Sequence, residues 1–211
     1  MAWDQWLGFF VASWIISLSP GAGAVASMST GHVVGFRRGY WNVVGLQLGL
    51  ILQVVIVAAG LGAILAASEL AFQAIKWFGV FYLLYLGWKQ WSATGDSGSG
   101  KHGLKADVNI GRLVFKGFLV NMSNPKAIVF LLAVLPQFLN LSQPVLSQYV
   151  WMTVTLVFVD SVVMLGYTGL ASRVLHALRS AKQQKMMNRT FGSLFMGAAS
   201  LLAMTHRSHN L

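Results

Sequence analysis

The feature that most constrains this chain is the sequence Asn124-Pro125-Lys126, which interrupts a segment otherwise apolar enough to cross a lipid bilayer. Proline inside a helix removes a backbone hydrogen bond and clashes with the preceding turn. A lysine at the centre of a membrane helix costs about 2.5–3.5 kcal/mol on insertion scales. A membrane segment that carries both residues is better explained by a use for them than by tolerance, so we interpret this break as functional.

The composition is that of an integral membrane protein. Of the 211 residues, 56% are hydrophobic and only 9% are charged, whereas about 25% charged residues are usual in soluble domains. The absence of cysteine excludes disulfides, thiolate metal sites and thiol redox chemistry. Residues 95–102 resemble a phosphate-binding loop but lack its final Ser or Thr. We therefore expect no enzyme activity, no metal site and no cofactor.

Six segments approach the length of about 20 apolar residues that a membrane helix needs. They are Trp6–Ala26, Trp41–Ala67, Phe72–Trp88, Leu113–Phe138, Tyr149–Ala171 and Phe191–Thr205. Between them we expect a polar, glycine-dotted connection around residues 30–39, a flexible Gly/Ser-rich linker at 92–111 and a basic loop at 173–189. The prediction is an all-α integral membrane protein with one transporter domain, 1–211, whose halves 1–91 and 112–211 each hold three transmembrane helices.

The basic residues give this arrangement an orientation. The formal net charge is +10, and most lysines and arginines fall in the connections between spans one and two, three and four, and five and six. Because basic loops stay in the cytoplasm, we expect both termini on the periplasmic side of a bacterial inner membrane. The asymmetry also explains the charge without a nucleic-acid partner. The residues concerned are Arg37, Arg38, Lys89, Lys101, Lys105, Arg112, Lys116, Arg173, Arg179, Lys182, Lys185 and Arg189.

A second break resembles the first. Ser19-Pro20-Gly21 interrupts the first span as Asn124-Pro125-Lys126 interrupts the fourth. Since three spans per half reverse the direction of entry, the two halves would be inverted repeats. Corresponding interrupted helices in such halves point to a transporter binding site. The alternative is a pair of ordinary proline kinks, which are common in membrane helices.

The residue types at the breaks suggest what they bind. Ser19 and Asn124 are good N-cap residues, and Pro20 and Pro125 would then occupy the first helical position, where proline is favoured. Each break would begin a half-helix whose positive end points to the middle of the membrane. Two such ends, with the charge of Lys126, predict a site for a small anionic group such as a carboxylate.

Asp160 is the only acidic residue deep in a predicted span, and an ionisable group there is a functional hypothesis by default. It could carry a proton in exchange for substrate, bind a substrate ammonium, or form a structural ion pair with Lys126. Gln47 and Asn121, with Asn42 and Gln53, are candidates for the cavity wall or for interhelical hydrogen bonds. The predicted substrate-binding residues are Ser19, Pro20, Gly21, Gln47, Asn121, Asn124, Pro125 and Lys126, with Asp160 as the proton-coupling residue. Gly45 and Gly49 form a G-x-x-x-G pair that permits close helix contact and makes a homodimer plausible.

At this level the sequence resembles the LysE/RhtB family of amino-acid exporters over nearly its whole length. The departure is Ala22, where many members carry a second proline. The motifs that carry the resemblance are Ser19-Pro20-Gly21-x-Gly23-Ala24, Gly35-x-Arg37-x-Gly39, Lys76-x-x-Gly79-x-x-Tyr82-Leu83-x-Tyr85-Leu86-Gly87, and Asn124-Pro125-Lys126-Ala127-Ile128-Val129-Phe130 with Pro136-Gln137-Phe138.

The resemblance is strongest to the homoserine/homoserine-lactone branch of that family. It implies proton-coupled export of small amino acids or their derivatives, such as homoserine, homoserine lactone or threonine-like molecules. The residues alone predict only an ion-driven transporter for a small polar solute, with protons, substrate and the lipid bilayer as partners. A passive facilitator or channel for small polar solutes is the alternative.

Overall fold

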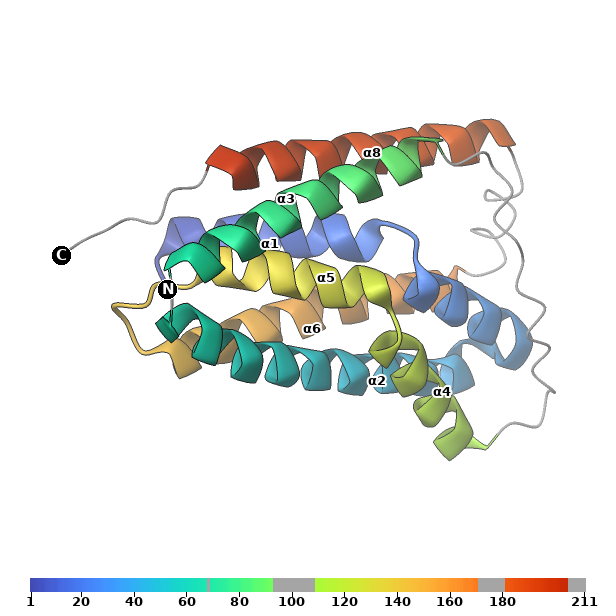
Figure 1. The fold of residues 1–211 in the computed structure, drawn as a ribbon. Coiled ribbons are helices and arrows are strands. Elements are labelled where there is room, and N and C mark those ends of the chain that lie inside the picture. Colours follow the sequence, from blue (N-terminus) through green and yellow to red (C-terminus); the bar gives the residue numbers. More distant parts are fainter. Residues whose placement is uncertain (68, 93–108, 171–180, 205–211) are drawn as a thin grey trace.

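The described part of the chain is entirely helical. The computed structural model describes residues 1–67, 69–92, 109–170 and 181–204, and these ranges contain helices and no strand (Figure 1). The predicted all-α class is thereby confirmed. The predicted linker at 92–111 falls almost wholly outside the described residues.

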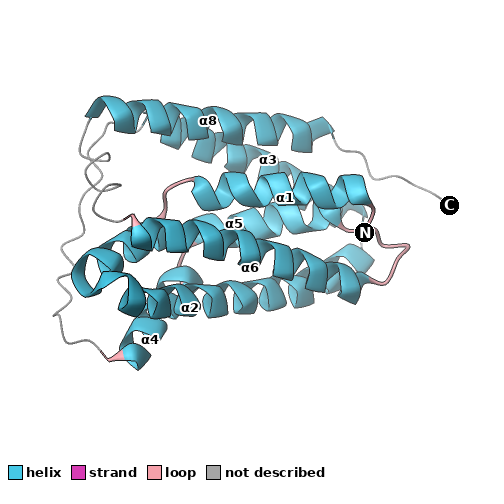
Figure 2. Ribbon diagram, turned by 180° about the vertical axis from the view of Figure 1, so that it is seen from behind, coloured by secondary structure: helices cyan, strands magenta, loops and turns pink. Residues whose placement is uncertain are grey.

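The first half of the chain contains α1 (Trp3–Leu18), α2 (Ala22–Ala67) and α3 (Glu69–Ser92). We expected a polar connection around residues 30–39. The structure instead continues α2 through these residues, and only Gly35 leaves the helical conformation. Gly35 has φ 77° and ψ 171°, a region essentially restricted to glycine. At this residue the chain turns back on itself, so that segment 22–34 and the remainder of α2 form a hairpin (Figures 1 and 2).

The second half contains α4 (Ile110–Met122), α5 (Pro125–Val134), the short 3-10 helix η1 (Leu135–Phe138), α6 (Val145–Gly169) and α8 (Ala181–Met204). α4 and the α5–η1 segment meet at an angle of 55°. The last helix begins within the predicted basic loop, ten residues before the predicted start at Phe191. Its first turns pack toward α3, where the Arg189 guanidinium lies 5.6 Å from the centre of the Trp91 ring.

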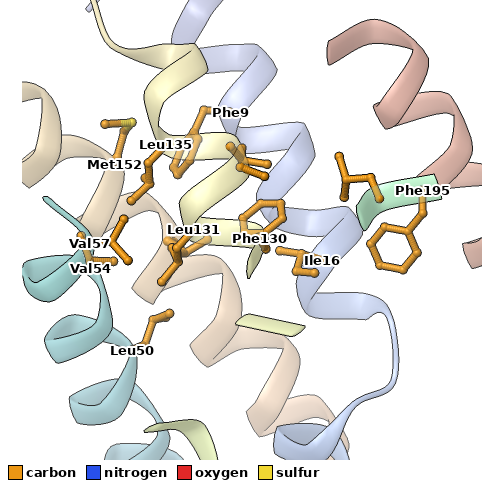
Figure 3. Packing of buried hydrophobic residues seen from close by; sticks show 14 of the residues in the cluster. Phe9, Ile16, Leu50, Val54, Val57, Phe130, Leu131, Leu135, Met152 and Phe195 are labelled. Atoms are coloured by element: carbon orange, nitrogen blue, oxygen red, sulfur yellow. The ribbon is translucent and has the colours of Figure 1, made fainter. Parts of the chain in front are cut away.

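The helices form a bundle in which α3 and α8 lie side by side along one edge, while α2 and α6 lie on the other (Figures 1 and 2). α5 runs through the middle beside α1, and Phe130 and Leu131 of α5 pack into the main apolar cluster with Phe9 and Ile16 of α1 (Figure 3). The start of α1 and the end of α8 lie at the same end of the bundle. The bend at Gly35, the start of α4 and the end of α6 lie at the other.

The G-x-x-x-G pair of α2 is used inside the chain. A Cβ atom on Gly45 would overlap the carbonyl group of Val114, and one on Gly49 would lie 2.9 Å from the carbonyl oxygen of Phe118. On the facing helix, a Cβ on Gly117 would overlap the carbonyl group of Asn42. The glycines thus allow α2 and α4 to cross in backbone contact. They are therefore not free to pack against a second copy of the chain, and the homodimer stays a prediction without this argument.

The outer faces of the bundle are apolar. Within the described residues, two helical segments, Ala22–Gly60 and Val145–Gly169, are long and apolar enough to cross a membrane. The bent pair Ile110–Met122 and Pro125–Phe138 also meets this condition if the two helices are taken together as one span. Large apolar side chains that face outward occur on every long helix. They include Leu7, Val11, Leu48, Ile51, Val55, Phe78, Phe81, Phe115, Leu146, Val154 and Phe158.

Candidate functional site

The break between α4 and α5 has the capping geometry that its sequence predicts. Asn124 is the N-cap of α5, and its side-chain oxygen accepts a hydrogen bond of 3.2 Å from the Lys126 backbone N–H. Pro125 occupies the first turn of the helix, where its missing N–H costs nothing. The predicted half-helix therefore starts inside the bundle with Lys126 in its first turn.

The break between α1 and α2 differs from the prediction. The Ser19 N–H still donates to the Ile15 carbonyl at 3.2 Å, so Ser19 ends α1 and does not cap the next helix. The next helix begins at Ala22, and the Gly21 carbonyl accepts its first hydrogen bond, from Val25 at 3.0 Å. Pro20 thus lies between the helices, and the assignment of Ser19 as N-cap was wrong. A new helix starts at this break nonetheless.

Both breaks open on one cavity of about 50 Å³. Its polar lining comes from α1 and the first break through Ser17, Ser19 and Gly21, and from the second break through Asn121, Asn124 and Lys126. α6 contributes Asp160. Residues 19–21, 124–126 and 160 are far apart in the sequence, and the fold brings them to the same place.

Lys126 reaches from its own helix to the first break. Its Nζ donates a hydrogen bond of 2.5 Å to the Ser19 carbonyl oxygen, and it lies 5.9 Å from the centre of the Phe195 ring. A Cβ on Gly21 would be 3.5 Å from Nζ, so Gly21 leaves room for the ammonium. The Ser19 carbonyl belongs to the last turn of α1, whose negative end favours a cation.

Asp160 is held from two other helices. Gln47 Nε2 donates to Asp160 Oδ2 at 2.8 Å, and the Ser17 side chain also hydrogen-bonds this carboxylate. Gln47 Oε1 and Ser19 Oγ are buried and have no hydrogen-bond partner among the described residues. Lys126 and Asp160 therefore line one cavity, while the Lys126 ammonium donates to the Ser19 carbonyl and the Asp160 carboxylate accepts from Gln47 and Ser17. The arrangement presents an ammonium, a carboxylate and polar atoms with unused hydrogen-bonding capacity.

Comparison with known proteins identifies the family. The profile of the LysE type translocator family matches residues 14–206. The chain belongs to this family. It is 43% identical over 203 residues to the homoserine/homoserine lactone efflux protein of Salmonella typhimurium, an alignment that covers 96% of this chain and 98% of that protein. No solved structure matches the chain.

Other relatives of this translocator cover nearly its whole length too. An uncharacterized membrane protein of Vibrio cholerae is 40% identical over 200 residues, or 94% of this chain and 96% of that one. The leucine efflux protein of Salmonella choleraesuis is 27% identical over 197 residues, or 92% of each. A LysE type translocator is a membrane transport protein and not an enzyme, and the two Salmonella relatives are named as efflux proteins, one for homoserine and its lactone and one for leucine.

The other predicted site residues of the translocator have different surroundings. Asn121 lines the cavity, but its Nδ2 donates to the Leu46 carbonyl at 2.7 Å and its own carbonyl accepts from Gln53 at 2.7 Å. Asn121 and Gln53 therefore join α2 to α4. Gln47 acts on the cavity through Asp160, and Pro20 and Pro125 shape the breaks without lining it.

Sequence reasoning missed Ser17 and the apolar wall of the cavity. Ser17 lies one helical turn after Ser13 in an apolar helix, and both are buried. Two serines at this spacing lie on one face of the helix, and this pattern could have indicated a buried polar face. The wall includes Phe130, Leu156 and Met164, which no local pattern separates from other apolar residues.

The cavity is small. Pockets that enclose small molecules usually measure about 300–1,000 Å³, against about 50 Å³ here. A molecule larger than a few waters would need the walls around the two breaks to move apart.

Proposed function

We propose that this translocator exports small neutral amino acids, homoserine and its lactone foremost, by exchange for protons across a bacterial inner membrane. The observation that carries the proposal is the cavity at the two helix breaks, which Lys126 and Asp160 both line. The family and the names of the most similar relatives support the substrate class.

The chemistry of the cavity suits a zwitterion. A substrate carboxylate would be bound by Lys126 and by the two helix N-termini at Gly21 and Asn124, since such ends attract anions. A substrate ammonium would be bound by Asp160 and by the Ser19 carbonyl, which Lys126 would release on turning to the carboxylate. The unpartnered Ser19 Oγ is available for a substrate hydroxyl.

Asp160 is the residue we propose for proton coupling. It is the carboxylate that lines the cavity among the described residues, and a proton on it would cancel its attraction for the substrate ammonium. Protonation from the periplasm would then favour release of substrate on that side. Gln47 and Ser17 hold the carboxylate in the cavity in the meantime.

We further propose six spans in two inverted repeats, with both termini in the periplasm. Helix packing supports the repeat: α2 packs on α4 as α6 packs on α1, and the third helices of the two halves, α3 and α8, pack on each other. The basic residues Arg37, Arg38 and Arg112 lie by the bend of α2 and the start of α4, at the end of the bundle opposite the start of α1. Basic loops belong in the cytoplasm.

The test is uphill transport by the purified protein in proteoliposomes. With an acidic interior and an alkaline exterior, an antiporter should accumulate radiolabelled homoserine inside above its external concentration, and a protonophore should abolish the accumulation. A passive facilitator would bring the two concentrations level and no further. Equilibration of homoserine without accumulation would therefore refute the exchange mechanism, and no uptake of any amino acid or lactone would refute the substrate class.

A further inference from the structure

Three polar side chains are buried although they neither line the cavity nor have a hydrogen-bond partner among the described residues. Ser27, Thr30 and Asn42 are each 0% exposed. Ser27 Oγ, Thr30 Oγ1 and both side-chain amide atoms of Asn42 have no hydrogen-bond partner among the described residues. Leaving a buried polar group unsatisfied is unfavourable, so apolar residues of the same size would stabilise this packing.

All three residues belong to the hairpin that bends at Gly35. At the open end of the hairpin, a Cβ on Gly23 would lie 3.7 Å from a methyl carbon of Leu46; near the bend, a Cβ on Gly39 would lie 3.4 Å from the Cα of Gly31. Ser27 is one helical turn after Gly23, and Asn42 is about one turn before Leu46. The two arms therefore place Ser27 and Asn42 at the same level, and Thr30 one turn closer to the bend.

The row begins where the substrate cavity ends. Gly23, Ala24 and Leu46 line the cavity, and Ser27 lies one turn beyond them. Past Thr30 the hairpin closes against α6, because a Cβ on Gly31 would overlap the carbonyl group of Thr168. Beyond that contact, His32 and Arg37 are exposed. The polar row thus spans the distance between the cavity and the end of the bundle that the basic residues mark as cytoplasmic.

We infer that segment 22–34 is the cytoplasmic gate of the translocator, and that Ser27, Thr30 and Asn42 line the path by which a zwitterionic amino acid and its water reach the cavity. This inference rests on the proposed function for the direction of transport and the class of molecule. The side chains offer hydroxyl and amide groups, which replace hydration without holding an ion. Gly35 combines a backbone conformation that favours glycine with open space around its Cβ position, which suits a pivot for this segment.

A static water molecule bonded to the three side chains is the competing explanation, since buried waters commonly satisfy such groups. It predicts a sealed hairpin, whereas a gate predicts that reagents larger than water reach these positions. The chain contains no cysteine, so any introduced cysteine is the sole thiol and its accessibility can be measured directly.

The experiment compares single-cysteine variants in inside-out and right-side-out vesicles with a membrane-impermeant thiol reagent. Ser27→Cys, Thr30→Cys and Asn42→Cys should react at least tenfold faster than Ser13→Cys in inside-out vesicles, and no faster than it in right-side-out vesicles. Ser13 is equally buried, at 0% exposed, but its hydroxyl donates to the Phe9 carbonyl at 2.8 Å. His32→Cys marks the rate of an exposed site. Rates equal to that of Ser13→Cys would overturn the inference.

A second variant keeps the inference testable if a cysteine disturbs folding. Asn42→Leu should leave the melting temperature unchanged or higher, because it removes an unsatisfied amide, and should reduce homoserine transport at least fivefold. Unchanged transport would count against the gate. The outcomes also separate the two proposals, because labelling requires no substrate. Reactive cysteines in a protein that moves no amino acid would refute the proposed function alone, and transport with unreactive cysteines would refute the gate alone.

Discussion

Replacing Lys126 with methionine should impair transport of homoserine far more than transport of homoserine lactone. Methionine keeps the unbranched shape of the side chain and removes the ammonium. Hydrogen bonds to charged groups contribute about 1.5–3 kcal/mol, and 1.4 kcal/mol is a factor of ten in affinity. The KM for homoserine should therefore rise about 10- to 100-fold. The lactone has no carboxylate, so it forms no ion pair with Lys126 and should be affected much less.

The assay is initial uptake of each labelled substrate into proteoliposomes with a fixed proton gradient. Lys116→Met is the matched control, since Lys116 is also half-buried on a helix of the second half but lies outside the cavity. The variant also loses the hydrogen bond of Lys126 to the Ser19 carbonyl, which would affect both substrates alike if its role were structural. Equal losses for homoserine and the lactone would therefore refute the carboxylate-binding role of Lys126.

Three further predictions follow from the packing. Gly45→Ala should lower the free energy of unfolding by about 1–3 kcal/mol, because its Cβ overlaps α4, whereas Gly60→Ala has open space and should be neutral or slightly stabilising in thermal unfolding in detergent. Gly35→Ala should destabilise the protein by about 1–3 kcal/mol, because the backbone conformation of Gly35 is unfavourable for alanine. Gly166→Ala is the control, since Gly166 lies in a helix and also has no neighbour within 4 Å, and it should not destabilise. Equal melting temperatures of the two variants would contradict the bend at Gly35. Phe130 lines the cavity, so Phe130→Leu enlarges the cavity and should raise the ratio of leucine to homoserine transport. An unchanged ratio would show that Phe130 does not limit substrate size.

Some of the site was predictable from local sequence. The helix start at Asn124-Pro125-Lys126 depends on capping by neighbouring residues only, and the structure contains the predicted helix start. At the first break the predicted cap, Ser19, instead ends α1, because its N–H stays bonded to the Ile15 carbonyl of the preceding helix. Residue preferences at a helix start do not show whether the preceding helix continues this far.

The remaining features depend on distant parts of the chain. The hydrogen bond from Gln47 to Asp160 joins residues 113 positions apart, and hydropathy gives no information on such pairs. The G-x-x-x-G pattern predicted close contact but could not name α4 as the partner of Gly45. The reversal around residues 30–39 was predicted, but its form was not: the helix continues on both sides of a single bend at Gly35, and the flanking residues have a composition that suits either a loop or a helix.

The most direct test of the whole account is proton-driven accumulation of homoserine by the Asp160→Asn variant in proteoliposomes. Asparagine keeps the size of the side chain and one oxygen that can accept from Gln47 or Ser17, but it cannot exchange a proton. We expect the variant to reach the membrane in normal amounts, to bring homoserine to equal concentrations at most, and to move no protons when substrate is added. Accumulation equal to that of the wild-type protein would contradict a coupling role for Asp160 and with it the proposed exchange at the two helix breaks.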